Sequence, residues 1–226
     1  VCIGMPDSVS PTARPRIVSR EEWRSASAEL LVHEKAATRT LDALAARRRR
    51  MPMVAMPGGY RFVGPDGECS LIDLFAGRGQ LIVYQFMDNG PDDYCSGCAS
   101  VCDNVGRPEH LNARDTSFAV VSNMPYAQIA AFRQRMQWSF PFVSSRGTTF
   151  SADCGAGAGF GISAFLRDGE DAYQTYFSTD RGGDKMRMDF MLLDITVFGR
   201  QESWEDSPAG WPQTPPYTWW RLHDEY

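Results

Sequence analysis

The spacing of apolar residues along the chain predicts strands alternating with helices. The segments from Gln80 to Met87 and from Thr116 to Ser122 are almost continuously apolar, which is typical of strands buried on both faces. A helix is expected from Cys95 to about Val105, between these two strands, and another from Tyr126 to Trp138. The middle of the chain therefore predicts an α/β protein with a mixed sheet.

Turn residues and periodicity extend this pattern in both directions. Residues 60–71 alternate before a P-D-G turn and predict a β-hairpin. Ile162–Leu166 and Ala172–Phe177 predict an antiparallel pair, and Asp184–Leu193 a closing helix. From residue 80 onward the expected order is β-α-β-α-β-β-α, which is the order of a thioredoxin fold.

A long helix is predicted ahead of this domain. Ser19 and Glu22 fit the S-x-x-E capping box, and Pro52 blocks continuation beyond Arg47–Arg50. Apolar residues between these limits form a single stripe: Trp23, Ala26, Leu30, Ala37, Leu41 and Leu44. The arginines are interpreted as a solvated helix end, because no aromatic residues interleave them as in a nucleic-acid site.

Four parts are thus expected along the chain. Residues 1–18 form a flexible arm, 19–56 a helical extension and 57–203 the α/β domain. Residues 204–226 form an irregular tail that packs on the domain. The tryptophans of this tail also leave a homodimer possible.

The chemistry of the chain is concentrated in the sequence Tyr94-Cys95-Ser96-Gly97-Cys98, which follows the first buried strand. A C-x-x-C at a helix start holds two sulfurs within disulfide reach, and the helix N-terminus stabilises the first thiolate. Cys95 is therefore the expected nucleophile and Cys98 the resolving thiol. Cys102 lies one helical turn further on the same stripe and adds a possible third thiol. Two alternatives remain open: inert packing of the three thiols, or a metal site that would also use His110.

Other residues near the motif are weaker candidates. Asp103 is a possible proton acceptor for the dithiol, or a residue that only solvates the helix. Aromatic and hydroxyl side chains after the second predicted helix, together with Tyr94, are candidates for a substrate groove: Trp138, Pro141 and Ser144.

Composition narrows the function classes. The chain has 226 residues with a net charge of −5, so no overall basic surface favours nucleic acid. No apolar run reaches the roughly 18 residues of a membrane helix, and the N-terminus lacks the apolar core of a secretory signal. We therefore expect a cytoplasmic protein. Clustering of three among its six cysteines then indicates redox catalysis or metal binding.

Segments across residues 18–226 carry a resemblance to a known family. They are Val18–Trp23, Leu71–Phe75, Gln80–Met87, His110–Asp115, Arg135–Trp138, Phe140–Ser145, Leu193–Asp194, Gly199–Glu202 and His223–Tyr226. The chain resembles the thioredoxin-like proteins called domain-of-unknown-function family 899, which are related to the peroxiredoxin-like alkyl-hydroperoxide-reductase/thiol-specific-antioxidant group. The resemblance implies a thioredoxin-like fold and maps the family's C-x-x-C and following Asp onto Cys95, Cys98 and Asp103.

The chain departs from its wider relatives in three ways. Family members usually have aromatic residues where this chain has Ala99-Ser100-Val101-Cys102, and the added thiol allows a Cys98–Cys102 or Cys95–Cys102 disulfide. The peroxiredoxin pattern P-x-x-x-T-x-x-C is absent, and Asp92 and Asp93 precede the motif, where negative charge raises a thiol pKa. Thioredoxins have a cis-proline before the antiparallel pair, where this chain has Gly161-Ile162.

The predicted function is a thiol–disulfide oxidoreductase without a bound organic cofactor. Its partners would be a thiol or disulfide substrate and a reducing thiol system, with no nucleic acid and no membrane. The alternatives are a thiol peroxidase, in which Cys95 becomes a sulfenic acid, and a non-catalytic binding module with structural or metal-bound cysteines.

Overall fold

The computed structural model describes residues 14–226, so most of the predicted arm and Cys2 lie outside the described residues. The chain forms two compact units. Pro52–Met191 and Trp219–Tyr226 make up one, here called the α/β unit. The other, called the helical unit, contains the described part of Val1–Met51 together with Leu192–Thr218. The last eight residues of the predicted tail thus belong to the α/β unit, while residues 204–218 do not.

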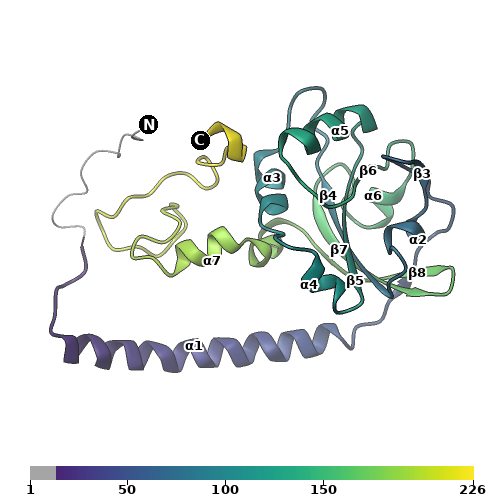
Figure 1. The fold of residues 1–226 in the computed structure, drawn as a ribbon. Coiled ribbons are helices and arrows are strands. Elements are labelled where there is room, and N and C mark those ends of the chain that lie inside the picture. The colour runs from purple at the N-terminus through teal and green to yellow at the C-terminus, as the bar shows by residue number, and fades with distance from the viewer. Residues whose placement is uncertain (1–13) are drawn as a thin grey trace. The chain divides into compact units, whose positions relative to one another are not determined.

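The α/β unit is built on an eight-stranded mixed sheet with the order β1-β8-β7-β4-β5-β6-β2-β3 (Figure 1). The strands are β1 (Val54–Ala55), β2 (Phe62–Gly64), β3 (Gly67–Cys69), β4 (Gln80–Phe86), β5 (Thr116–Ser122), β6 (Phe142–Ser144), β7 (Gly161–Asp168) and β8 (Asp171–Ser178). Strand β4 is parallel to β5 and antiparallel to β7, and β7 is antiparallel to β8. These four strands have the order and polarity of the thioredoxin fold, as the sequence predicts.

The helices are α1 (Arg20–Arg48), α2 (Leu71–Leu74), α3 (Ser96–Asp103), α4 (Glu109–Asn112), α5 (Tyr126–Arg135), α6 (Phe150–Asp153) and α7 (Met188–Asp194). Two short 3₁₀ helices, Asp180–Met186 and His223–Glu225, complete the described elements.

Side chains on β4 and β5 alternate between two cores, one on each face of the sheet. Tyr84 and Phe86 face a core that α3 and α5 cover. Leu81 and Val83 face a second core, which α2 and α6 cover. Burial on both faces explains why these strands are apolar at nearly every position.

Three predicted elements differ from the observed ones. Helix α5 ends at Arg135 rather than Trp138, because Gln137 has a positive φ of 55° and the chain then turns Trp138 into the core. The sequence predicts no strand at β6, yet β6 pairs in parallel with β5 and antiparallel with β2. The predicted closing helix is divided at Arg187 between a 3₁₀ helix and α7.

The helical unit contains α1, whose predicted capping box at Ser19 is confirmed. No residue of α1 is buried, and the apolar side chains of its predicted stripe are exposed, including Trp23 at 59% and Leu41 at 63%. In the segment 192–218 of this unit, the buried Glu202 carboxylate accepts hydrogen bonds from the Trp204 indole and the Tyr217 backbone. Among residues 14–226, no helix is both long and apolar enough to cross a membrane.

Replacing Phe142 by alanine should destabilise the α/β unit by about 3–5 kcal/mol, because truncating a core aromatic leaves a cavity. Phe142 is 1% exposed, and its ring centroid lies 5.6 Å from that of Phe86. Urea unfolding followed by tryptophan fluorescence measures the loss. Val63→Ala is the control, since Val63 is 39% exposed on the neighbouring strand. Equal losses in the two variants would contradict the core position of β6.

Candidate functional site

Cys95 is the N-cap residue of α3, immediately before the first helical turn. Its backbone is extended, with φ −60° and ψ 108°, and its Sγ accepts a hydrogen bond from the backbone N–H of Cys98 at 3.3 Å. A sulfur thus occupies the place where a serine or aspartate oxygen usually satisfies the first helical N–H groups. The predicted position of the first thiol at a helix start is confirmed.

The environment of Cys95 favours its thiolate. Hydrogen bonding from the Cys98 thiol lowers the pKa of Cys95 to about 7, assisted by the backbone N–H groups of Cys98 and Gly97. Partial burial opposes this shift, and so does the negative charge of Asp93, as the sequence predicts. Because the hydrogen bonds outweigh these two effects, Cys95 is substantially ionised near neutral pH.

Cys98 is in the opposite situation, with only 1% of its surface exposed. Burial raises the pKa of Cys98 well above its ordinary value, and the adjacent Cys95 sulfur adds to the increase. The Tyr84 hydroxyl, on β4 beneath the helix, hydrogen-bonds to the Cys98 sulfur and lowers that pKa in part. Tyr84 is itself 2% exposed and belongs to the same core as Cys98. Sequence reasoning missed Tyr84; its signal was a phenol in a mostly apolar strand.

Cys102 is buried in that core as well, and burial raises its pKa well above the usual value. Its thiol is therefore a poor nucleophile and fills space between α3 and the sheet. All the cysteines among the described residues are free: Cys69, Cys95, Cys98, Cys102 and Cys154.

Asp103 lies at the other end of α3 from the nucleophile. Eight residues separate it from Cys95, which corresponds to about 12 Å along a helix axis. Its Oδ1 accepts a hydrogen bond from the Trp138 indole at 2.7 Å and lies 2.9 Å from Nδ1 of His223. The structure therefore places Asp103 among groups that hold the domain together.

The four residues predicted to line a substrate groove have different environments. Trp138 is 8% exposed and packs in the core, and Ser144 is 3% exposed and donates its hydroxyl hydrogen bond to the Met124 carbonyl. Tyr94 stacks on Phe132 with ring centroids 3.7 Å apart, and Pro141 is exposed. Trp138 and Ser144 are therefore buried, whereas Pro141 is exposed and Tyr94 half-buried.

The alternative metal site would have combined His110 with the three clustered cysteines. His110 lies in the short helix α4. Throughout residues 14–226, no three histidine, cysteine or acidic side chains are grouped so that they could hold a metal ion.

Residues 12–226 match the family described as a bacterial protein of unknown function, DUF899. The chain belongs to the DUF899 family. The resemblance found in the sequence segments is thereby confirmed. None of the curated proteins matches the chain.

Three of the solved structures that resemble this DUF899 chain illustrate the range of its likenesses. Peroxidoxin BcpB from Mycobacterium tuberculosis is 17% identical, with a TM-score of 0.42 over 59% of this chain and 93% of that one. A putative protein disulfide isomerase from Bacteroides thetaiotaomicron is 13% identical, with a TM-score of 0.43 over 62% and 90% of the two chains. Peroxiredoxin Q from Xanthomonas campestris is 15% identical, with a TM-score of 0.39 over 58% and 90%. The strand order of the DUF899 chain itself establishes its fold.

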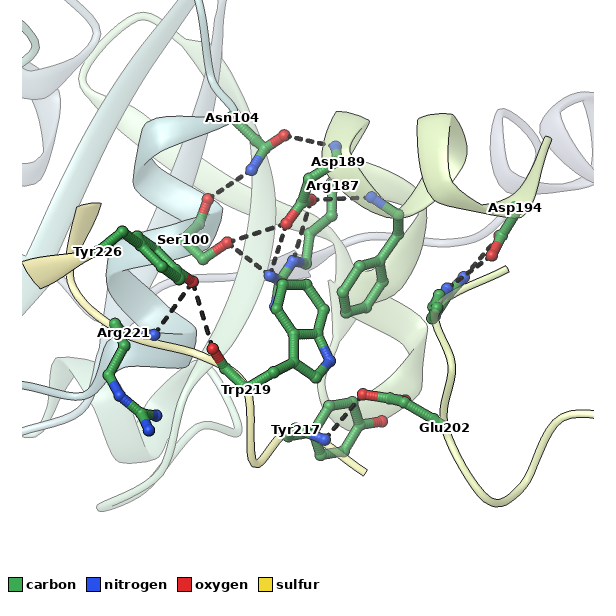
Figure 2. A network of polar contacts seen from close by, with 12 residues as sticks. Ser100, Asn104, Arg187, Asp189, Asp194, Glu202, Tyr217, Trp219, Arg221 and Tyr226 are labelled. Atoms are coloured by element: carbon green, nitrogen blue, oxygen red, sulfur yellow. Dashed lines mark hydrogen bonds and ion pairs between the residues drawn. The ribbon is translucent and has the colours of Figure 1, made fainter. Parts of the chain in front are cut away.

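A polar network that sequence reasoning missed holds α3 in this DUF899 chain (Figure 2). The Asn104 side-chain amide donates to the Ser100 carbonyl and accepts from the Asp189 backbone N–H at 2.9 Å. The buried Arg187 guanidinium pairs with Asp189 at 2.8 Å and donates to the Ser100 hydroxyl. Polar residues spaced i, i+4 on an apolar helix were the available signal.

The rate of Cys95 alkylation by iodoacetamide should rise with pH around a midpoint of about 7, because only the thiolate reacts. Cys98→Ala should move this midpoint to higher pH, since it removes the thiol that hydrogen-bonds to Cys95. Cys102→Ala is the matched control and should leave the midpoint in place. Rates are read at Cys95 by peptide mapping. A wild-type midpoint of about 8.5, the ordinary pKa of a free thiol, would contradict the claim that hydrogen bonds lower the pKa of Cys95.

Proposed function

We propose that the protein is a thiol–disulfide oxidoreductase in which Cys95 attacks and Cys98 resolves. The observation that carries this proposal is the contrast between the two thiols at one helix start. Hydrogen bonds lower the pKa of the half-buried Cys95 to about 7, while burial raises that of Cys98. This contrast suits an exposed attacking thiolate and a protected second thiol.

The reaction proceeds by two exchanges. The Cys95 thiolate attacks one sulfur of a substrate disulfide, forming a mixed disulfide and releasing the other sulfur as a thiolate, which takes up a proton. Cys98 then loses its proton and attacks the Cys95 sulfur, which releases the second substrate thiolate and closes a Cys95–Cys98 disulfide. The substrate has gained two electrons and two protons. A partner dithiol then reduces the Cys95–Cys98 disulfide by supplying two electrons and two protons to the protein. Such a partner is consistent with the predicted cytoplasm, and no organic cofactor is required.

Tyr84 supports the resolving step in this proposal. Cys98 needs to become a thiolate inside the core, where ionisation is costly. Hydrogen bonds from the Met87 backbone and the Tyr84 hydroxyl offset part of this cost. We assign Asp103 a positioning role, because Trp138 and His223 occupy its carboxylate. We assign Cys102 no part in the exchange, because the thiol hydrogen-bonded to Cys95 is that of Cys98, and Cys102 lies a helical turn further on.

A redox titration with alkylation and peptide mapping tests the proposal. We expect a reversible Cys95–Cys98 couple between roughly −120 and −270 mV, the span of dithiol oxidoreductases. Cys102→Ser should retain this couple, and Cys95→Ser should abolish it. A failure of Cys95 and Cys98 to form a disulfide would contradict the proposal and favour the binding module. Peroxide turnover that depends on Cys95 would instead support the thiol peroxidase.

Tyr84→Phe should slow the resolving step, because the Cys98 thiolate loses one of its two hydrogen-bond donors and the pKa of Cys98 rises further. The mixed disulfide at Cys95 should then persist longer after reaction with a small disulfide, as measured by quenched-flow mass spectrometry. The initial attack by Cys95 should change little. Tyr94→Phe removes a different hydroxyl beside the motif and is the control. Equal resolving rates in wild type and Tyr84→Phe would exclude the proposed role of Tyr84.

A further inference from the structure

The C-terminal segment Trp219–Tyr226 lies against the dithiol helix, within the α/β unit. Leu222 is 5% exposed and packs in the same core as Cys98. His223 lies against Asp103 at the end of α3, and Arg135 on α5 pairs with Asp224 at 2.7 Å and Glu225 at 2.8 Å. Apolar burial and ion pairs thus fix the segment beyond Trp220.

Trp220 occupies the space directly over Gly97, the residue between Ser96 and Cys98 in the dithiol motif. A Cβ atom at Gly97 would lie only 2.5 Å from Cζ3 and 2.9 Å from Cε3 of the Trp220 ring. Any residue other than glycine would therefore collide with the indole. The ring covers this side of the C-x-x-C turn, and glycine is required there for close approach.

A cation and a second aromatic ring hold the Trp220 ring in place. The Arg187 guanidinium lies 4.2 Å from the Trp220 ring centroid and 3.9 Å from that of Phe190. Phe190 and Trp220 also stack on one another, with centroids 6.0 Å apart. Arg187 is in turn fixed by Asp189 and Ser100 (Figure 2). The buried guanidinium lies over both rings, and cation–π contacts in such a desolvated site fix the position of the indole.

We infer that Trp220 is a specificity-determining residue of the dithiol, which selects low-molecular-weight disulfides over disulfides of folded proteins. This inference rests on the proposed function. Attack on a disulfide needs the attacking, central and leaving sulfurs in line, so the substrate has to reach over the motif. A folded protein brings a broad surface to that approach and meets the Trp220 ring beside Gly97. A small disulfide is narrow enough to approach Cys95 without meeting the ring.

Two measurements on the full chain test separately whether the Trp220 ring obstructs access to Cys95 and whether it selects among disulfides. The first compares alkylation of Cys95 by iodoacetamide and by a polyethylene-glycol maleimide, scored by peptide mapping. The second compares the rates at which the reduced protein reacts with bis(2-hydroxyethyl) disulfide and with insulin. Trp220→Ala and Trp220→Leu are the test variants. Trp23→Ala is the matched control, because Trp23 is 59% exposed on α1.

In both Trp220 variants we expect two rate ratios to rise about tenfold, a shift typical of altered pocket contacts. These are the ratio of maleimide to iodoacetamide alkylation and the ratio of insulin to bis(2-hydroxyethyl) disulfide reduction. Gly97→Ala displaces the same ring without removing it and should shift both ratios in the same direction, which guards against misfolding of the Trp220 variants. Unchanged ratios, with Cys95-dependent exchange intact, would overturn the inference and leave the proposed function standing. Absence of Cys95-dependent exchange with either disulfide would overturn the proposed function, and the inference with it.

Discussion

A sulfur atom caps the N-terminus of α3, and the arrangement of the dithiol follows from that one contact. The Cys98 N–H points at the Cys95 sulfur, so the chain leaves its extended conformation at Cys95 and begins a helix one residue later. One turn into that helix, the thiol of Cys98 is directed into the core that lies between α3 and β4. This hydrogen bond assists the Cys98 thiol in lowering the pKa of Cys95, and the helix that begins there carries Cys98 into the core.

A helix of eight residues does not sustain this geometry by itself, since isolated helices of that length are marginal in water. Its neighbours supply the support. Ser100 and Asn104 bind Arg187 and Asp189 on one side, and Asp103 links Trp138 to His223 at the C-terminal end. The side chains that hold α3 thus come from segments more than thirty residues distant in sequence. The dithiol site depends on tertiary contacts far more than on local helix propensity.

The sequence was informative where burial is continuous and local rules are strong. Strands β4 and β5 were predictable because both faces are covered, and α1 because of its capping box. Strand β6 was not, since three residues are too few to show a period. The positions of Asp103, Ser144 and Trp138 depend on partners distant in sequence, which no spacing rule identifies. The Tyr84 contact with Cys98 was hidden for the same reason.

Helix α1 has a thermodynamic consequence that its sequence does not suggest. It contributes 29 helical residues and yet buries none of them. Because the heat-capacity change of unfolding scales with the apolar surface that becomes exposed, melting of α1 adds little to it. Far-ultraviolet circular dichroism, by contrast, detects every turn of the helix. Calorimetry and circular dichroism therefore follow different parts of this chain as it is heated, and a two-state description applies to the α/β unit alone.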